Sequence, residues 1–398
     1  MKRFFFLMLF AGVSLLAANA ADKEELRYVD ARQFRLINTA FPGQTATPWS
    51  RIPTAIKDSI TDNLWERGSN SSGYGIRFRT NSVRIGAHYR LTGNFHMKHM
   101  ADTGIKGTDL YILDDNGKWQ YVNTARPVDD TLQHKIYVEN LDGRMHEFMF
   151  YLPLYDGIRW FEIGVDSAAT IEAPAIDNPR AHKKVIFYGT SILQGGCASR
   201  TGMVATNMIQ RDMNVECVNL GVSGEGKLVY PMARQMAQIE DAIAFVIDPV
   251  PNCTQMQCDT LTYGFIRILR DARPEVPIIM VEGPMYPYAK FDSFFRNYLP
   301  LKNEAFRKNY DKLKAENPDN LYYVTCDGLN GPDDEGTVDG IHLTDFGFRA
   351  YADKLEKVLY QVFMDQYIRQ VEASQKAAAE AKAAAAQKPA SKKKSSKK

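Results

Sequence analysis

The sequence has little net charge and no long apolar run beyond its first residues. Lys and Arg exceed Asp and Glu by only two, and both ends of the chain are basic. Residues 1–20 carry +2 and residues 374–398 carry +7, which leaves −7 on the body between them. An acidic body offers no basic surface for nucleic acid, so we expect no nucleic-acid partner. No stretch after residue 20 approaches 18 apolar residues, so we expect no transmembrane segment.

Both ends of the chain have a composition that differs from the rest. Two basic residues precede an apolar run over 4–16, and residues 18–20 read Ala-Asn-Ala, which is typical of a signal peptide cleaved after Ala20. We therefore expect a secreted or periplasmic protein. Residues 365–398 are rich in Ala and then in Lys, which predicts a tail that is first helical and then disordered. Adhesion of this tail to an anionic surface or glycan is the alternative.

Cysteine is scarce, and its number is odd. Five cysteines leave at least one thiol unpaired within the chain. Four residues separate Cys253 from Cys258, and no histidine is nearby, which is poor spacing for zinc. An exported chain can form disulfides, so a Cys253–Cys258 bridge and a bridge to Cys197 both stay open. A pair of histidines, His96 and His99, lacks further ligands, and we expect no metal site.

The first half of the chain has the short periods of a β domain. Several runs between about 28 and 175 alternate apolar and polar residues, and Asn116-Gly117 is a strong hairpin signal between two of them. No long helical pattern interrupts these runs. We therefore predict a β-sandwich over residues 21–175. The runs are 75–80, 82–86, 109–113, 147–150 and 159–165.

After about residue 180 the pattern changes to apolar runs separated by helical segments. Such an order predicts βαβ units and a parallel sheet with helices on both faces, over residues 180–364. The expected strands are 185–188, 215–220, 244–247, 278–281 and 321–324, and helices are expected over 261–272 and 294–316.

Polar residues of one chemical set follow these expected strands. In an open α/β sheet, ligands bind beyond the carboxyl ends of the strands. Ser191 follows the first strand, Gly224 the second and Asn252 the third, while Asp339 and His342 follow the fifth. His342 can take the Ser191 proton, and Asp339 can fix the imidazole. The backbone N–H groups of Ser191 and Gly224 and the Asn252 amide can bind a developing oxyanion.

Four short blocks carry a resemblance to a known family. The blocks are Gly-Thr-Ser-Ile (189–192), Ser-Gly-Glu-Gly (223–226), Pro-Asn (251–252) and Asp-Gly-Ile-His (339–342). Together they resemble the signature blocks of the SGNH (GDSL-like) hydrolases. The resemblance implies a flavodoxin-like three-layer domain with a five-stranded parallel sheet. It also implies that Ser191, Asp339 and His342 are catalytic, and that Ser191, Gly224 and Asn252 form the oxyanion hole.

A longer resemblance points to one subgroup of this family. The strings 188–200 and Gly-Thr-Asp-Leu-Tyr (107–111) are similar to members with a β-rich, jelly-roll-like domain before the hydrolase domain. Two departures stand out. Thr190 replaces the Asp of the Gly-Asp-Ser-Leu form, and Val250 and Cys253 stand near Asn252 where the family usually has Gly and Asp. Arg200, Tyr286 and Tyr288 follow expected strands and are candidates for the substrate pocket.

These observations predict an exported serine esterase that needs no metal or organic cofactor. Export, a β-sandwich partner domain and the lack of an apolar lid helix favour a polar, extended substrate, so we expect removal of O-acetyl groups from carbohydrate. An acylhydrolase for short-chain lipids or acetyl-phospholipids is the alternative with the same chemistry. A glycan-binding protein with a degenerate hydrolase domain is the alternative of another class. The expected partner is an acylated small molecule or glycan, and no pattern sets the oligomeric state.

Overall fold

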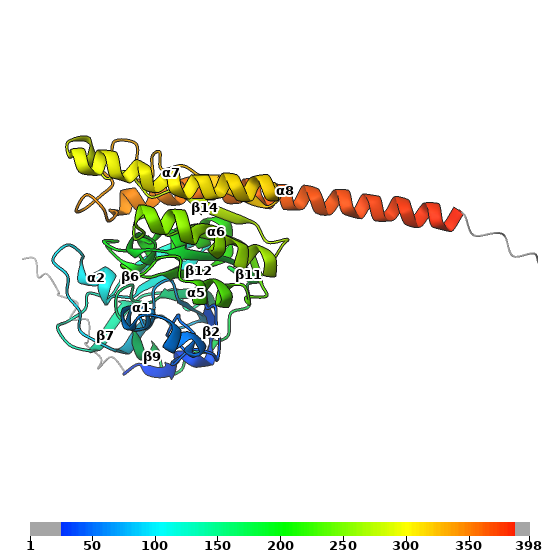
Figure 1. Ribbon diagram of the computed structural model, residues 1–398. Coiled ribbons are helices and arrows are strands. Elements are labelled where there is room, and N and C mark those ends of the chain that lie inside the picture. The colour runs from blue at the N-terminus through cyan, green and yellow to red at the C-terminus, as the bar shows by residue number, and fades with distance from the viewer. Residues whose placement is uncertain (1–24, 387–398) are drawn as a thin grey trace, which may run out of the picture.

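A computed structural model describes residues 25–386 of the chain, and Figure 1 shows their arrangement. The expected signal peptide lies outside the described residues, as does the last part of the Lys-rich tail. An antiparallel β domain comes first, and an α/β domain with a parallel sheet follows it. The predicted fold class is therefore confirmed.

The N-terminal β domain consists of two antiparallel sheets with an aromatic core between them. One sheet has the strand order β1-β9-β4-β7, and the other has the order β10-β3-β8-β5-β6 with β2 paired to β3. Phe78, Phe148, Phe150 and Phe161 are fully or almost fully buried in this core. Burying each ring contributes about 1.5–3 kcal/mol.

The strands of the first sheet are β1 (Arg27–Asp30), β4 (Ile85–Leu91), β7 (Leu132–Val138) and β9 (Ile158–Val165). Those of the second are β2 (Arg35–Ile37), β3 (Gly75–Thr80), β5 (Asp109–Leu113), β6 (Trp119–Thr124), β8 (His146–Tyr151) and β10 (Ile171–Glu172). Four short helices complete this part: η1 (Ala31–Gln33), η2 (Thr54–Ser59), α1 (Asp62–Gly68) and α2 (Asp102–Ile105). The β5–β6 turn at Asn116-Gly117 places Gly117 at φ +75°, as the sequence predicts.

The α/β domain has a five-stranded sheet in the order β12-β11-β13-β14-β15, with every neighbouring pair parallel. Its strands are β11 (Arg180–Gly189), β12 (Val215–Gly221), β13 (Ala242–Asp248), β14 (Ile278–Val281) and β15 (Leu321–Val324). Its helices are α3 (Ser191–Gln194), η3 (Thr201–Met203), α4 (Ala205–Met213), α5 (Tyr230–Met236), α6 (Gln255–Ala272), η4 (Pro287–Lys290), α7 (Ser293–Glu316) and α8 (Asp345–Ala386).

Helices cover both faces of this sheet, because its strands are apolar on both sides. Val185 and Phe187 of β11 lie in the cluster that includes residues of α4 and α8. The alternate residues, Ile186 and Tyr188, lie in the cluster that includes residues of α5, α6 and α7. Because the strands are parallel, their carboxyl ends lie at the same edge of the sheet. The predicted site residues follow these ends, so they are expected at that edge.

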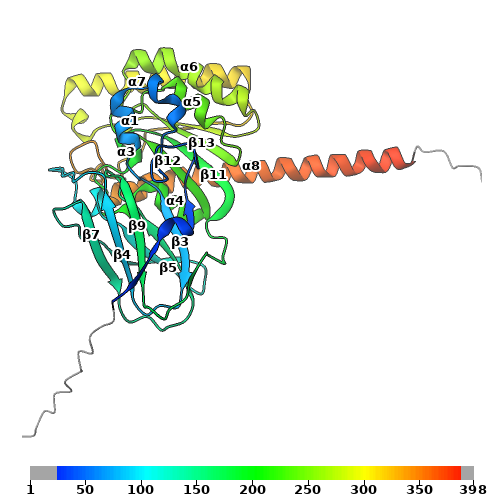
Figure 2. The same ribbon diagram turned by 90° about the horizontal axis from the view of Figure 1, so that it is seen from below.

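One segment between β2 and β3 belongs to the α/β domain by its packing. Phe41, Ile52, Ile56 and Leu64 are buried in the same cluster as Met232 of α5. Figure 2 shows α1 among the helices of the α/β domain, away from β4, β7 and β9. The prediction of one sandwich over residues 21–175 thus has an exception, because the apolar side chains of this segment are buried in the core of the α/β domain.

A fully buried arginine fastens this segment to the parallel sheet. The Arg51 guanidinium donates to the backbone oxygens of Asn219 (3.0 Å) and Gly221 (2.6 Å) at the end of β12. It also donates to the backbone oxygens of Arg67 (3.0 Å), in the last turn of α1, and of Asn70 (2.8 Å), just after that helix. Four hydrogen bonds satisfy a cation that burial would otherwise make costly.

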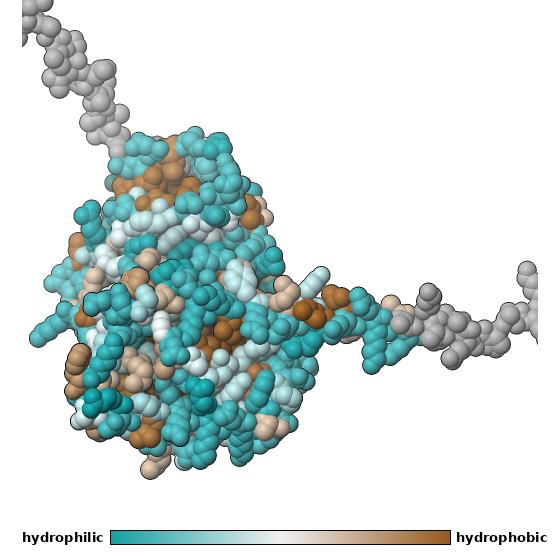
Figure 3. Space-filling model, turned by 90° about the horizontal axis from the view of Figure 1, so that it is seen from above, coloured by the Kyte–Doolittle hydropathy of each residue, from teal (hydrophilic) through white to brown (hydrophobic). Residues whose placement is uncertain are grey.

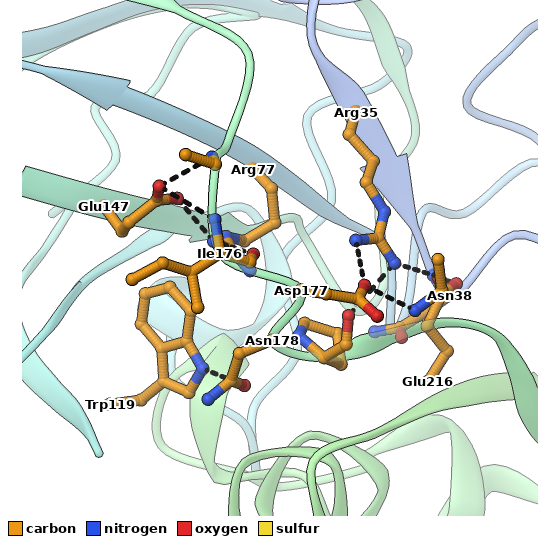
Figure 4. A network of polar contacts seen from close by, with 12 residues as sticks. Arg35, Asn38, Arg77, Trp119, Glu147, Ile176, Asp177, Asn178 and Glu216 are labelled. Carbon is orange, nitrogen blue, oxygen red and sulfur yellow. Dashed lines mark hydrogen bonds and ion pairs between the residues drawn. The ribbon is translucent and has the colours of Figure 1, made fainter. Parts of the chain in front are cut away.

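The linker between the domains is held by a buried ion pair (Figure 4). Arg77 Nη2 lies 2.6 Å from Glu147 Oε2, and the Arg77 side chain has no exposed surface. The other oxygen of Glu147 accepts the N–H groups of Ala175 (2.7 Å) and Ile176 (3.2 Å). One β-domain carboxylate therefore fixes the path of the chain as it leaves the sandwich.

Further contacts tie the same linker to both domains. Trp119 Nε1 donates to Asn178 Oδ1 at 2.9 Å. Arg35 pairs with Asp177 of the linker (3.2 Å) and with Glu216 of β12 (2.7 Å), as Figure 4 shows. The linker is therefore anchored on both sides.

A second interdomain contact joins the Gly-Thr-Asp-Leu-Tyr motif to the loop after α3. Arg200 Nη1 lies 2.6 Å from Asp109 Oδ2 and 2.7 Å from the Tyr111 hydroxyl. The same carboxylate oxygen accepts the Gly202 N–H at 2.8 Å, and the Asp109 side chain is fully buried. The Arg200 guanidinium also lies over the Tyr121 ring, 3.9 Å from its centroid. Arg200, expected in the pocket, instead joins the domains.

Helix α8 begins beside the sheet and then projects from the body (Figure 1). Its described part carries the Ala-rich stretch to Ala386, so the helical start of the expected tail is present. Four exposed apolar side chains lie along it near the body, and Figure 3 shows apolar surface there. They are Tyr360, Met364, Tyr367 and Ile368. Among residues 25–386, no helix has the length and apolarity needed to cross a bilayer.

A buried carboxyl group closes the end of β13. Asp248 is fully buried, and its Oδ2 accepts the Tyr351 hydroxyl at 2.6 Å. Its Oδ1 has no hydrogen-bond partner among the described residues. Burial raises the pKa of Asp248 to about 8, although the Tyr351 hydrogen bond opposes the rise. The folded protein therefore keeps this carboxyl protonated at neutral pH.

The first prediction concerns the interdomain pair. Arg200→Met leaves the buried Asp109 carboxylate without its cation, and we expect the free energy of unfolding to fall by about 3–5 kcal/mol. Urea-induced unfolding measures the change. Arg144→Met is the control, because Arg144 pairs with Asp142 on the exposed surface and its loss should be barely measurable. Equal effects of the two substitutions would contradict the interdomain role.

The second prediction concerns Asp248 and pH. The unfolded chain ionises this carboxyl near pH 4, whereas the folded chain holds its proton until about pH 8. Its contribution to stability is therefore fully present below pH 4 and is lost as pH rises towards 8, by up to about 1.4 kcal/mol per unit. Asp248→Asn should remove this loss. Denaturation of both proteins at several pH values tests it, and parallel pH profiles would be the contrary result.

Candidate active site

The predicted nucleophile lies at the turn from β11 into α3. The strand ends at Gly189, and the Thr190 hydroxyl caps the helix by accepting the Ile192 N–H at 3.3 Å. Ser191 is the first helical residue, and 7% of its surface is exposed. The N–H of a first helical residue has no intrahelical acceptor. Ser191 therefore presents a hydroxyl and a free backbone donor at the same place.

The structure brings Ser191, His342 and Asp339 into one chain of hydrogen bonds. Ser191 Oγ lies 2.8 Å from His342 Nε2. His342 Nδ1 lies 2.8 Å from Asp339 Oδ2. This is the order in which a base can take the serine proton while a carboxylate stabilises the imidazolium. The structure therefore brings these three residues together, as expected from their positions after the strands.

The 339–342 loop orients its own carboxylate. Asp339 Oδ1 accepts the backbone N–H groups of Ile341 (3.0 Å) and His342 (2.8 Å), while Oδ2 faces the ring. Burial alone would raise the pKa of Asp339, but the hydrogen bonds from His342 and Ile341 outweigh it and lower the pKa. Asp339 therefore stays ionised into the acidic range. Gly340 turns the loop with φ +84°, a conformation that favours glycine.

The loops after β11 and β12 touch without intervening side chains. A Cβ on Gly226 would lie 2.2 Å from the Gly189 carbonyl oxygen, so only glycine fits there. In the loop after β12, Gly224 has φ +74°. Its N–H makes no hydrogen bond to another described residue. Asn252 Oδ1 accepts the Gly226 N–H at 3.2 Å. That bond fixes the amide and leaves its NH₂ group as a donor.

Gln194 of α3, which the sequence analysis did not single out, positions the Gly224 turn. Its Oε1 accepts the Ser223 N–H at 2.8 Å. Its Nε2 donates to Asn70 Oδ1 (3.1 Å) and to the Leu154 carbonyl (3.0 Å). A single buried amide thus connects α3, the loop after β12 and two segments of the N-terminal half. Local sequence patterns do not indicate hydrogen bonds between segments so far apart in the chain.

Tyr155 from the β domain reaches the nucleophile's backbone. Its hydroxyl donates to the Ser191 carbonyl at 3.2 Å. A Cβ on Gly196 would lie 2.9 Å from this hydroxyl and 2.8 Å from His342 Cδ2, so the three residues are packed together. The sequence interpretation missed Tyr155, because it lies 36 residues before Ser191 in the other domain.

Tyr288 and Tyr286 lie beside the 339–342 loop. A Cβ on Gly340 would lie 2.8 Å from Tyr288 Cδ1, and the two tyrosine rings are 5.5 Å apart. Burial raises the pKa of Tyr286 to about 12. Lining of the pocket by these rings stays a prediction. Arg200 does not join them, since it is bound to Asp109 at the domain interface.

A groove on the β-domain side adjoins this site. It has a volume of about 380 Å³, and Tyr155 is one of its walls. Phe95 in this groove is 47% exposed, so part of its side chain is accessible to a ligand. The other lining residues are Glu66, Arg67, Ser69, Asn70, Thr92, Gly93 and Met97. Most of these carry polar or charged groups.

His99 is a further residue that sequence reasoning did not connect with the site. Its ring centroid lies 5.6 Å from that of His342. One group of three possible metal ligands was found in the described part of the chain, and it consists of His99, Cys197 and His342. His96, the other histidine of that short motif, is not in this group and lies 3.0 Å from both Asp102 and Asp129. All five cysteines are free.

Comparison with known families matches almost the whole described chain. Residues 182–360 match the GDSL-like lipase/acylhydrolase family. Residues 26–171 match the GxDLY domain, described as the N-terminus of the SGNH hydrolase type of esterase. Among curated proteins, no significant match was found.

Solved structures give the same result. A protein of Bacteroides ovatus described as a GDSL-like lipase is 33% identical, with a TM-score of 0.80 over 85% of this chain and 98% of its own. The salicylyl-acyltransferase SsfX3 of a tetracycline biosynthetic pathway is 16% identical, with a TM-score of 0.68 over 85% of this chain and 97% of its own. A family two carbohydrate esterase of Clostridium thermocellum is 14% identical, with a TM-score of 0.51 over 73% of this chain and 92% of its own.

The last two likenesses concern the fold alone. The family matches and the Bacteroides relative go further, because they cover both domains and include the segments that carry Ser191 and His342. The chain belongs to the GDSL-like lipase/acylhydrolase family of carboxylic ester hydrolases, in the form with an N-terminal GxDLY domain.

Proposed function

We propose that the protein is an exported serine esterase that removes O-acetyl groups from carbohydrate through an acyl-enzyme. The observation that carries the proposal is the hydrogen-bonded series Ser191–His342–Asp339. The N–H groups of Ser191 and Gly224 and the Asn252 NH₂ group make no hydrogen bond to another residue in the described part of the chain, so they are free to bind an oxyanion. Export rests on the expected signal peptide of residues 1–20, which lies outside the described residues.

The first half of the reaction acylates the serine. His342 Nε2 takes the Ser191 hydroxyl proton while Oγ attacks the carbonyl carbon of the ester. The carbonyl oxygen becomes negative and accepts hydrogen bonds from the N–H groups of Ser191 and Gly224 and from the Asn252 amide. The C–O bond to the alcohol then breaks, and His342 gives its proton to the leaving alkoxide. The alcohol departs and the acetyl group stays on Oγ.

The second half uses the same groups on water. His342 takes a proton from a water molecule, whose oxygen attacks the acyl carbon. The same donors bind the second oxyanion, and its collapse releases acetic acid and returns the proton to Ser191 Oγ. Asp339, ionised throughout because its pKa is lowered, stabilises the imidazolium in both halves.

The position of the groove suggests where the alcohol part of the substrate lies. His342 protonates the leaving oxygen, so the alcohol must lie on the side of His342. That side meets the groove through Gly196 and Tyr155, which pack against one another and the His342 ring. A sugar fits the polar lining, and its C–H face can stack on Phe95. Support for a saccharide also comes from the fold, which the chain shares with a carbohydrate esterase solved in complex with cellohexaose.

The third prediction tests the chemistry and the substrate class together. We expect the full-length chain to release acetate from acetylated oligosaccharides, and to prefer p-nitrophenyl acetate to longer p-nitrophenyl esters. Ser191→Ala removes the nucleophile and should lower kcat on the order of 10⁴- to 10⁶-fold. The matched control is Ser374→Ala, because Ser374 lies exposed on the projecting part of α8.

Two results would count against this proposal in different ways. Good turnover of long acyl chains without acetate release from saccharides would reject the substrate class and favour a lipid acylhydrolase. No turnover of any ester by a folded parent protein would reject the chemistry and favour a glycan-binding role.

The fourth prediction concerns the groove. Phe95→Ala removes the stacking face, so we expect KM for an acetylated oligosaccharide to rise roughly three- to tenfold. KM for p-nitrophenyl acetate should change much less, because that ester is too small to require the groove. Tyr367→Ala, which removes an exposed aromatic side chain from α8, is the control. An equal change of KM on both substrates would show that Phe95 does not bind the sugar.

A further inference from the structure

Three side chains from three distant segments meet beside the triad. His99 comes from the loop before α2, Cys197 from the loop after α3, and His342 from the loop before α8. Each offers one donor atom, and the three atoms lie within 4.8 Å of one another. The arrangement spans both domains, so it exists only when they are packed together.

The backbones that carry these side chains are held in place by contacts of their own. A Cβ on Gly104 of α2 would lie 2.3 Å from the Ala198 carbonyl oxygen, so helix and loop touch directly. The Thr103 hydroxyl donates to the Ser199 carbonyl at 2.5 Å. Ser199 in turn donates to Asp345 through its N–H (2.9 Å) and its hydroxyl (2.5 Å). The three ligand-bearing loops are therefore positioned before any ligand arrives.

Two imidazoles and one thiol are a ligand set that suits a thiophilic divalent cation. Zinc binds Cys sulfur at about 2.3 Å and His nitrogen at about 2.0–2.1 Å, so tetrahedral ligands lie about 3.5 Å apart. The donor atoms lie within 4.8 Å of one another, so the longest separation has to shorten by about 1 Å, and the side chain of His99 is exposed. Three protein ligands leave the fourth position for water.

The Cys197 thiol must lose a proton to bind a metal. Burial raises the pKa of Cys197 to about 12, with a smaller contribution from the Asp339 charge. The free thiol is therefore protonated and unreactive at neutral pH. A cation takes up the thiolate and releases the proton to solvent, so Zn²⁺ and the thiol give a Zn–S bond and H⁺.

Metal binding has a direct consequence for the triad, because both nitrogens of His342 are already in use. Nε2 bonds Ser191 and Nδ1 bonds Asp339. A metal that takes either nitrogen breaks one of these two bonds. We propose that His99, Cys197 and His342 form an inhibitory site for zinc or a similar thiophilic cation, and that the bound cation disables the base of the serine hydrolase. The inhibitory half rests on the proposed function, whereas the binding half does not.

The test measures zinc inhibition in the full-length chain after removal of metals by chelation. Hydrolysis of p-nitrophenyl acetate is followed at increasing Zn²⁺, and each protein is compared with its own zinc-free rate. We expect Cys197→Ser and His99→Gln each to raise the inhibition constant by at least about tenfold. Cys326→Ser and His96→Gln are matched controls, since neither residue is in the cluster, and should leave the constant unchanged.

A second readout does not depend on catalysis. Co²⁺ replaces zinc, and the thiolate-to-cobalt charge-transfer absorption reports the Cys197 bond directly. The band should appear in the parent protein and in Ser191→Ala, and should be absent in Cys197→Ser. A band in a parent protein that hydrolyses no ester would support the metal site and count against the proposed function.

Two outcomes would overturn the site. Equal zinc inhibition of the parent and both site variants would mean that the cation binds His342 alone or acts elsewhere. Absence of the charge-transfer band from the parent would mean that Cys197 is not a ligand.

Discussion

The active site depends on a steric constraint at the edge of the parallel sheet. The loops that follow β11 and β12 approach so closely that Gly226 has no room for a side chain against the Gly189 carbonyl. This contact brings the Gly224 turn to the start of α3, and the Gly226 N–H then fixes the Asn252 amide. Backbone packing thus positions the Gly224 turn and the Asn252 amide, and their proposed role is to bind a developing oxyanion without reorganisation during the reaction.

The N-terminal β domain is part of the same construction. Tyr155 hydrogen-bonds the carbonyl of the nucleophile, and the buried Arg51 secures the neighbouring segment to the end of β12. The ion pair of Asp109 and Arg200 joins the domains at a further point. Because these buried groups have hydrogen-bond partners across the interface, separation of the domains would leave polar groups without those partners. The N-terminal β domain therefore contributes a residue, Tyr155, that contacts the site directly.

The sequence was informative where local pattern decides structure. Buried parallel strands are short apolar runs, so the five strands and the residues at their ends, including Ser191 and His342, were found without a structure. It was uninformative where side chains meet across domains. Tyr155 and Gln194 make contacts with distant segments, and no local sequence pattern indicates such contacts. Arg200 follows a strand, as Ser191 does, but its side chain pairs with Asp109. The packing of the segment around Ile56 was not predicted for the same reason, because its apolar side chains are buried in the core of the α/β domain.

The proposed chemistry depends on Ser191 as a nucleophile activated by His342. The most direct measurement is covalent labelling of the full-length chain with a fluorophosphonate, followed by peptide mass spectrometry and repeated with His342→Ala. We expect one adduct, on Ser191, which forms rapidly in the parent protein and is lost or greatly slowed without the imidazole. An adduct on another residue, or labelling of Ser191 at the same rate in both proteins, would contradict it.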